Sequence, residues 1–252
     1  MSKSKQTQAV DPESADMRRK DLYNIGGVCG ILISALIVLA IVIYFIWPYQ
    51  PGLTSPADIF TTIQNNKLSG LMSLDFFMIV LTFFVVPYFL TLYVSTKDAN
   101  ESYALIALVF GLMSCVLAFI MRPIAEMFYL SGQYAAATTD VARNQYLAAG
   151  EALSALFNGT AWIVSFISFG VELLITSVLM LRIKAFSKAT AYLGIFLTIG
   201  LLSVLVVIVP GLAPMATMIN LVTTLIWAMW NVLVARTFFQ LARGTATASQ
   251  TA

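Results

Sequence analysis

The chain has 252 residues, of which 60% are hydrophobic and 10% are charged, and its mean hydropathy is +0.87. A soluble domain holds about 45–50% apolar and about 25% charged residues, so the composition excludes an ordinary soluble domain. The formal net charge of +2 is too small to indicate nucleic-acid binding. The chain contains no histidine, which excludes histidine-based zinc, haem and copper sites.

Six separated apolar runs each have about the length of a lipid bilayer core. About 20 apolar residues in a helix cross about 30 Å of hydrocarbon. The runs cover residues 25–47, 71–93, 103–121, 161–181, 191–209 and 215–234. They predict an all-α integral membrane bundle of six transmembrane helices within residues 21–241. Residues 1–20 and 242–252 are predicted to be disordered cytoplasmic tails.

Basic residues gather on one side of the predicted bundle. With six spans, the segments between them fall alternately on two sides, and one side holds eleven of the fourteen Lys and Arg residues. The other side holds only Lys67, Arg122 and Arg143. The positive-inside rule therefore predicts a multi-pass protein of the cell inner (cytoplasmic) membrane with both termini in the cytoplasm.

Two connections on the non-cytoplasmic side are long enough to fold. After the first span, Thr54 or Ser55 would cap a short helix over residues 57–65, with a proline at its first position. The connection over residues 122–160 has a helix-favouring composition. We expect it to continue the third span outward, to turn near Ser131-Gly132 and to return as a helix to the fourth span.

A stripe of small residues and two cysteines bear on helix packing. Gly26, Gly30 and Ser34 are spaced four apart on one face of the first span. This spacing permits close helix approach, either within the chain or in a homo-oligomer or with another membrane partner. Cys29 and Cys115 would differ in depth by about 10 Å or more, which predicts two free cysteines rather than a disulfide.

Ionisable residues inside or beside the spans are the candidate functional residues, because charge in a bilayer is costly. They are Asp75, Arg122, Glu126 and Glu172. Arg122 and Glu126 are four apart and would share a helix face at the outer end of the third span. They form either an ion pair that anchors the interface or, together with Asp75, an outward-facing binding vestibule.

Glu172 lies near the middle of the fourth span, and no basic residue of any span lies at a comparable depth. Its carboxyl is therefore expected to be protonated or hydrogen-bonded, and to face the interior with Ser165, Ser168 and Thr176. Its carboxyl either forms a structural interhelical hydrogen bond or acts as a proton-coupling or ligand-binding group. The opposite face, expected to contact lipid, holds Ile163, Ile167, Leu174 and Met180.

Several short motifs resemble those of the bacterial membrane-protein family called domain of unknown function 4386. They are YFLTLY at 88–93, RPIAE at 122–126, FG at 169–170, LMLR at 179–182, AYLG at 191–194 and IWAMW at 226–230. The resemblance covers residues 23–241. In the family the Arg and Glu of the third helix usually stand three apart, whereas here they stand four apart around a proline. The resemblance implies the six-helix bundle and no particular activity.

The sequence shows no Ser-His-Asp set, metal cluster or phosphate-binding loop. It therefore predicts a non-enzymatic membrane protein with a structural, sensory or accessory role, without catalytic residues, metal or cofactor. The alternative is a small secondary transporter or channel that uses Glu172 as an intramembrane coupling or binding carboxyl. Against it, the halves show no convincing repeat. A third alternative is an intramembrane enzyme that acts on lipid through Glu, Asp and Arg alone. The lipid bilayer is the one partner that the sequence identifies, and any small-molecule ligand is unknown.

Overall fold

The computed structural model of the chain describes residues 12–201 and 213–244, and these residues form ten α-helices and no strand. The helices are α1 (Pro12–Ile46), α2 (Pro56–Asn65), α3 (Lys67–Ser73), α4 (Phe76–Thr96), α5 (Glu101–Ile120), α6 (Ile124–Ala136), α7 (Asp140–Phe157), α8 (Thr160–Met180), α9 (Lys188–Leu201) and α10 (Ala213–Ala242). The prediction of an all-α fold is confirmed for these ranges.

Five helical stretches of the described ranges are long and apolar enough to cross a membrane, and they include α1, α4, α5, α8 and α10. The helix α9 is apolar but only 14 residues long as described. It corresponds to the predicted fifth span, whose last residues, 202–209, lie outside the described residues. The structure is thus a membrane-type helical bundle with five candidate spans and one shorter apolar helix.

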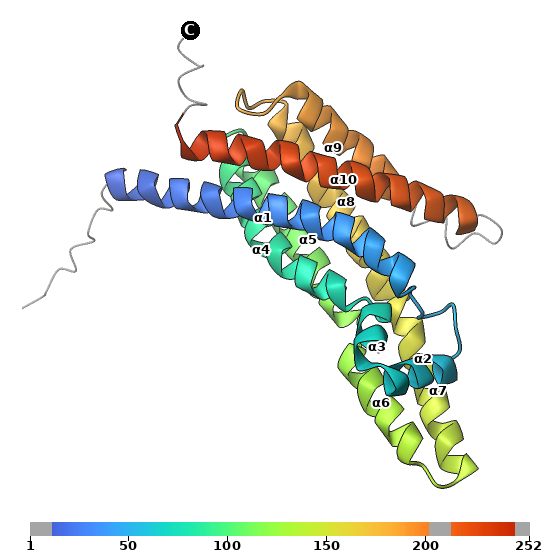
Figure 1. Cartoon of the computed structure of the whole chain (residues 1–252). Helices are drawn as coiled ribbons and strands as arrows, with labels where there is room; N and C mark the ends of the chain where they lie inside the picture. Colours follow the sequence, from blue (N-terminus) through green and yellow to red (C-terminus); the bar gives the residue numbers. More distant parts are fainter. Residues whose placement is uncertain (1–11, 202–212, 245–252) are drawn as a thin grey trace, which may run out of the picture.

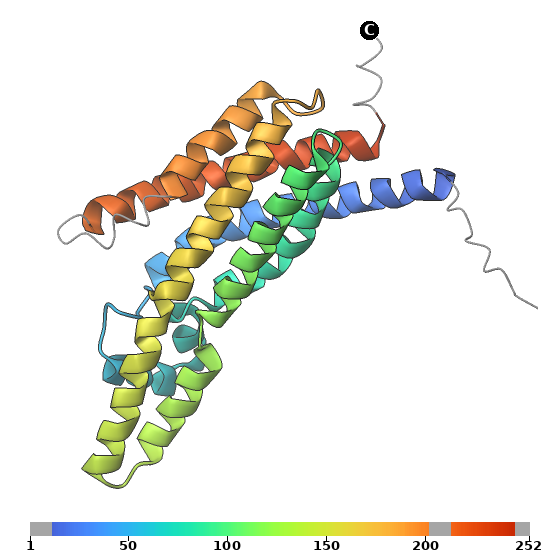
Figure 2. The same cartoon turned by 180° about the vertical axis from the view of Figure 1, so that it is seen from behind.

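Six helices form a closed ring, which Figures 1 and 2 show from opposite sides. Each helix packs against two neighbours, in the order α1, α4, α5, α8, α9, α10 and back to α1. Each also runs antiparallel to both neighbours, as α1 and α10 illustrate (Figure 1). The main core fills the ring, with Ile33, Tyr88, Leu173 and Trp230 almost completely buried.

The four remaining helices form a cap at one end of the ring (Figure 1). This cap consists of α2, α3, α6 and α7, and it has a small core of its own that includes Phe60, Leu74, Met127 and Phe157. The described start of α1, the α4–α5 and α8–α9 turns and the end of α10 all lie at the opposite end, called here the terminal end.

The predicted helix after the first span is present as α2, and the cap of this helix is Ser55, whose Oγ accepts from Asp58 N at 3.2 Å. The predicted turn near Ser131-Gly132 is wrong, because both residues lie inside α6. Ser131 is fully buried there and donates to Phe60 O at 3.0 Å, which holds α6 against α2. The chain turns instead at residues 137–139, where Thr139 caps α7.

Two predicted boundaries also differ from the structure. The helix α1 begins at Pro12, so residues 12–20 are helical where the sequence predicts a disordered tail, and residues 1–11 lie outside the described residues. A proline is compatible with the first turn of a helix, and no glycine follows until Gly26. The second span begins at Phe76 rather than at residue 71, because Asp75 adopts a left-handed backbone and separates α3 from α4.

The small residues of α1 contact helices of the same chain. A Cβ atom at Gly26 would lie 2.3 Å from Thr91 Oγ1 of α4, and one at Gly30 would lie 3.1 Å from Ala235 Cβ of α10. Ser34 donates to Ala228 O of α10 at 2.9 Å. The stripe therefore permits close packing of α1 against both ring neighbours, which is the intramolecular alternative. Cys29 and Cys115 are both buried and free, as predicted.

Candidate functional site

Glu172 lies in the middle of α8 and is only 2% exposed. Its Oε1 accepts a hydrogen bond from Thr176 Oγ1 at 2.9 Å, whereas its Oε2 is buried without a partner among the described residues. Ser165 and Ser168 are buried on the same face, so the prediction that Glu172 faces the interior is confirmed. Of the residues expected on the lipid face, Leu174 is exposed, but Met180 is buried against the core.

Neighbouring helices leave a close-fitting space for this carboxyl. A Cβ atom at Gly111 of α5 would lie 3.0 Å from Glu172 Cγ and 2.8 Å from Phe89 Cδ2. The glycine therefore gives room for both side chains. The carboxyl thus sits where α4, α5 and α8 meet.

Further polar atoms without partners lie in the same helical ring. Within the described residues these buried atoms come from α4, α8 and α10, and they are Tyr88 Oη, Glu172 Oε2, Ser177 Oγ, Trp227 Nε1 and Asn231 Oδ1. Aromatic contacts connect these helices: the side chain of Phe169 packs on that of Phe89, with ring centroids 6.0 Å apart, and on that of Trp227, with centroids 5.2 Å apart. A buried polar group without a partner costs about 1–3 kcal/mol. The interior therefore keeps hydrogen-bonding capacity that the side chains do not use among themselves.

A second polar cluster joins the ring to the cap. Arg122 Nε donates to Asp75 Oδ2 at 2.7 Å, and Arg122 Nη1 donates to Ala118 O at 2.6 Å. The hydroxyl of Tyr44 donates to the other carboxylate oxygen, Asp75 Oδ1. Asp75 and Arg122 are 7% and 9% exposed, so this is a buried ion pair with hydrogen bonds to both partners.

This pairing replaces the predicted ion pair between Arg122 and Glu126. The helix is interrupted at residues 121–123, between the end of α5 and the start of α6. Four residues across that interruption do not lie on one helix face, so Glu126 points elsewhere and is exposed. The sequence does contain a signal for the observed pair, because Asp75 and Arg122 have opposite charges at similar predicted depths.

The backbone at Asp75 is unusual. Its φ of 68° is the single positive φ at a non-glycine residue in the described ranges. Such a conformation costs about 1–3 kcal/mol and persists where the surroundings enforce it. Nearby, the pKa of the Tyr49 hydroxyl is raised, mainly by burial and in addition by the negative charge of Asp75. The same hydroxyl donates to Asn158 Oδ1 at 3.2 Å. This hydroxyl therefore stays protonated and connects the α1–α2 loop to the start of α8.

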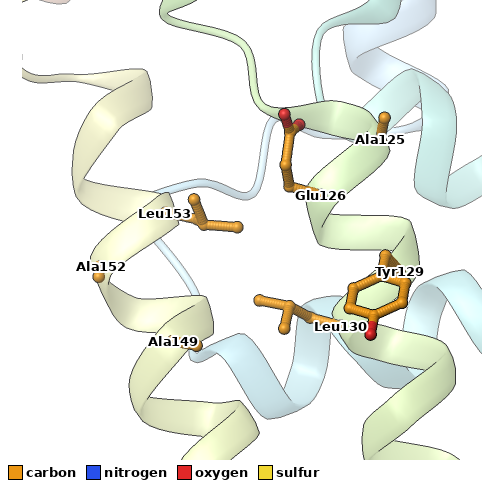
Figure 3. Close-up of a pocket in the computed structure, with 7 residues that line it drawn as sticks. All are labelled: Ala125, Glu126, Tyr129, Leu130, Ala149, Ala152 and Leu153. Carbon is orange, nitrogen blue, oxygen red and sulfur yellow. The ribbon is translucent and has the colours of Figure 1, made fainter.

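Glu126 lies on a groove between α6 and α7 (Figure 3), and no other candidate residue lines this groove. The groove has a volume of about 660 Å³ and is lined by Ala125, Glu126, Tyr129, Leu130, Ala149, Ala152 and Leu153. Leu130 and Leu153 point toward each other from the two helices. Asp75 is not among the lining residues, so the structure does not bring Asp75 and Glu126 into one vestibule.

The candidate residues thus lie at three separate locations, which are the interior carboxyl of Glu172, the buried ion pair of Asp75 with Arg122, and the exposed groove at Glu126. No group of three His, Cys, Asp or Glu side chains in the described ranges could hold a metal ion. The interior carboxyl can exchange a proton or form a further hydrogen bond, whereas both charges of the ion pair are already compensated.

A family model described as "Domain of unknown function (DUF4386)" matches residues 28–236. The matched region includes Asp75, Arg122, Glu126 and Glu172, and it extends from α1 to α10. No curated protein and no solved structure matches the chain.

Proposed function

Because the chain belongs to the family of domains of unknown function DUF4386, which carries no assigned activity, we propose a function from the geometry and the charge distribution of the chain. The first part of the proposal is topological: six spans cross the inner (cytoplasmic) membrane, and both termini are cytoplasmic. The ring order supports six spans, since α9 occupies a place equivalent to that of the five longer helices. The charge distribution supports the orientation. The basic residues described at the terminal end are Arg19, Lys20, Lys97, Arg182, Lys184, Lys188, Arg236 and Arg243.

The second part concerns activity: the protein is a non-enzymatic sensory or accessory membrane protein that responds to protons through Glu172. The observation that carries this proposal is the buried Glu172 Oε2 without a partner, halfway along a candidate span. A carboxyl in such a place changes its hydrogen bonding whenever it gains or loses a proton. The packed helices around it would respond to that local change.

Infrared difference spectroscopy on the full chain in lipid nanodiscs tests this directly. Spectra recorded in acidic and alkaline buffer report the carbonyl stretch of a protonated carboxylic acid. We expect the difference band of wild type to contain a component that is lost in Glu172→Gln and retained in Glu126→Gln, because the carboxyl of Glu126 is exposed on the cap. Tryptophan fluorescence should change over the same pH range, because Phe169, three residues before Glu172, packs on the ring of Trp227.

Two results would contradict the proposal. A difference band with the same shape and amplitude in Glu172→Gln as in wild type would show that Glu172 does not titrate. A Glu172 band without any accompanying change in tryptophan fluorescence would show that protonation does not alter the packing, and would leave Glu172 with the structural role of a hydrogen-bond partner of Thr176.

A proton-coupled transporter or channel is the second candidate. The partnerless polar atoms of α4, α8 and α10 favour it, because they line the interior in which a proton or polar solute would move. Proteoliposomes that enclose a pH-sensitive dye distinguish the two candidates. Proton flux that requires Glu172 supports transport. The absence of proton flux, together with a Glu172 that titrates in the infrared spectra, supports the sensory role.

A further inference from the structure

A second groove lies between α1 and α10 near the terminal end. Its volume is about 430 Å³, and it is lined by Ile31, Val232, Arg236, Phe239, Gln240 and Arg243. Ile31 and Val232 are 42% and 43% exposed, so the groove opens outward rather than into the ring. Both helices are candidate spans. The groove therefore faces the medium that surrounds the bundle.

The register of the two helices places the arginines at the end of the apolar region. Ser34 contacts Ala228, Gly30 contacts Ala235, and a Cβ atom at Gly27 would lie 2.7 Å from Phe239. Along α10 the lining begins with Val232 and continues through Arg236, Phe239 and Gln240 to Arg243, which lies about two turns beyond Arg236. The groove therefore has an apolar end at Ile31 and Val232 and a cationic end at Arg243, as a lipid leaflet has acyl chains toward its centre and headgroups at its surface.

The two arginines share one helix face, and the described residues provide no acidic partner for either. They are seven residues apart, which is about two turns, and both are exposed. Neither forms an ion pair with an acidic side chain of the described residues. Guanidinium groups bind phosphate oxygens with two parallel hydrogen bonds, so an unpaired pair beside an apolar wall is chemically suited to a phosphodiester.

We propose that the α1–α10 groove binds an anionic phospholipid, with its phosphodiester between Arg236 and Arg243 and one acyl chain along Ile31 and Val232. Charge complementarity selects an anionic headgroup, and the position of the groove at the end of two candidate spans selects a membrane lipid over a soluble anion. Basic pockets between membrane helices are known to bind such headgroups. The proposal does not depend on the role of Glu172.

Native mass spectrometry of the full chain in a neutral detergent tests the site. The probes are phosphatidylglycerol and phosphatidylcholine with identical acyl chains. Each arginine near an anionic lipid contributes about 1 kcal/mol, which is about fivefold in affinity, so wild type should prefer phosphatidylglycerol by about 30-fold. The Arg236→Gln/Arg243→Gln variant should lose most of that preference. Equal binding of the two lipids by wild type would overturn the proposal.

A matched control separates a site from general attraction to a basic surface. Arg182 and Lys184 are exposed in the α8–α9 turn, also at the terminal end, and do not line the groove. The Arg182→Gln/Lys184→Gln variant removes the same charge and should keep the preference of wild type. An equal loss in both double variants would show nonspecific attraction and would contradict the site.

A variant of the apolar wall and a soluble competitor test the two parts of the proposed lipid separately. Val232→Trp fills the apolar wall while both arginines remain, and it should weaken phosphatidylglycerol binding even if the arginine variant does not fold. Unchanged binding by this variant would place the lipid elsewhere. Glycerol 3-phosphate serves as the soluble competitor: displacement of the lipid by this anion at equal concentration would show that the site takes a free phosphate and not a lipid.

Discussion

Arg122 and Asp75 form a buried ion pair that connects two helix breaks, one between α3 and α4 and one between α5 and α6. Both breaks lie where the ring meets the cap (Figure 1). The pair therefore holds the chain at the points where it leaves the apolar bundle. Tyr44, near the end of α1, adds a third helix to this junction through its bond to Asp75.

Removing one partner of this pair should be more damaging than removing both. Arg122→Gln leaves the Asp75 carboxylate buried without its cation, which costs about 3–5 kcal/mol of unfolding free energy. The combined change Asp75→Asn/Arg122→Gln should cost less than the sum of the single changes. Thermal unfolding in detergent measures all three variants.

Glu126→Gln is the control for the ion pair, because Glu126 is exposed and stands apart from Arg122. We expect its melting temperature to equal that of wild type. Strictly additive losses for Asp75 and Arg122, or a large loss for Glu126→Gln, would show that the pairing in solution differs from that in the structure.

The hydrogen bond between Thr176 and Glu172 should be detectable as an energetic coupling. Thr176→Val keeps the shape of the side chain but leaves Glu172 Oε1 without its donor, which should cost about 1–3 kcal/mol. In a Glu172→Leu background the same change should cost nearly nothing. Chemical unfolding of the four proteins provides the cycle, and a coupling energy of zero would be inconsistent with the observed geometry.

Glu172→Gln should fold and should melt close to the wild-type temperature. Glutamine keeps the length of the side chain and an oxygen that can accept from Thr176 Oγ1. Circular dichroism and size-exclusion chromatography measure this. A variant that aggregates would argue for a structural role that requires the carboxyl itself.

Two glycines in helices should respond in opposite ways to alanine. A Cβ atom at Gly26 would lie 2.3–2.5 Å from three side-chain atoms of Thr91, so Gly26→Ala should overpack the α1–α4 contact and cost about 1–3 kcal/mol. A Cβ atom at Gly132 would meet nothing within 4 Å, so Gly132→Ala should stabilise α6 by about 0.5–1 kcal/mol. Similar effects at both positions would contradict the close packing of α1 against α4.

Alkaline phosphatase fusions measure the proposed topology. Fusions within the α1–α2 loop and at the α6–α7 turn should be active, because phosphatase functions only outside the cytoplasm. Fusions at the α4–α5 turn and the α8–α9 turn should be inactive. An active fusion at the α8–α9 turn would invert or rearrange the spans and would overturn the six-span proposal.

Particular residues show why only part of the candidate site could be predicted. The depth of Glu172 follows from its position within one apolar run, since helix rise converts residue number into distance. Its inward orientation follows from the polar residues that share its helical face. The partner of Arg122 does not follow in the same way, because local spacing indicates Glu126 only if the helix is unbroken, and the interruption at Pro123 removes that condition.

Local hydrophobicity and short motifs along the chain are enough to predict the class of protein, the positions of the apolar helices and the family. The order in which the helices close the ring, the packing of the cap and the pairing of Asp75 with Arg122 became known from the tertiary structure alone. These features depend on contacts between residues far apart in the sequence, such as Ser131 with Phe60 or Gly30 with Ala235. Such contacts are set by packing in three dimensions, which no single segment encodes.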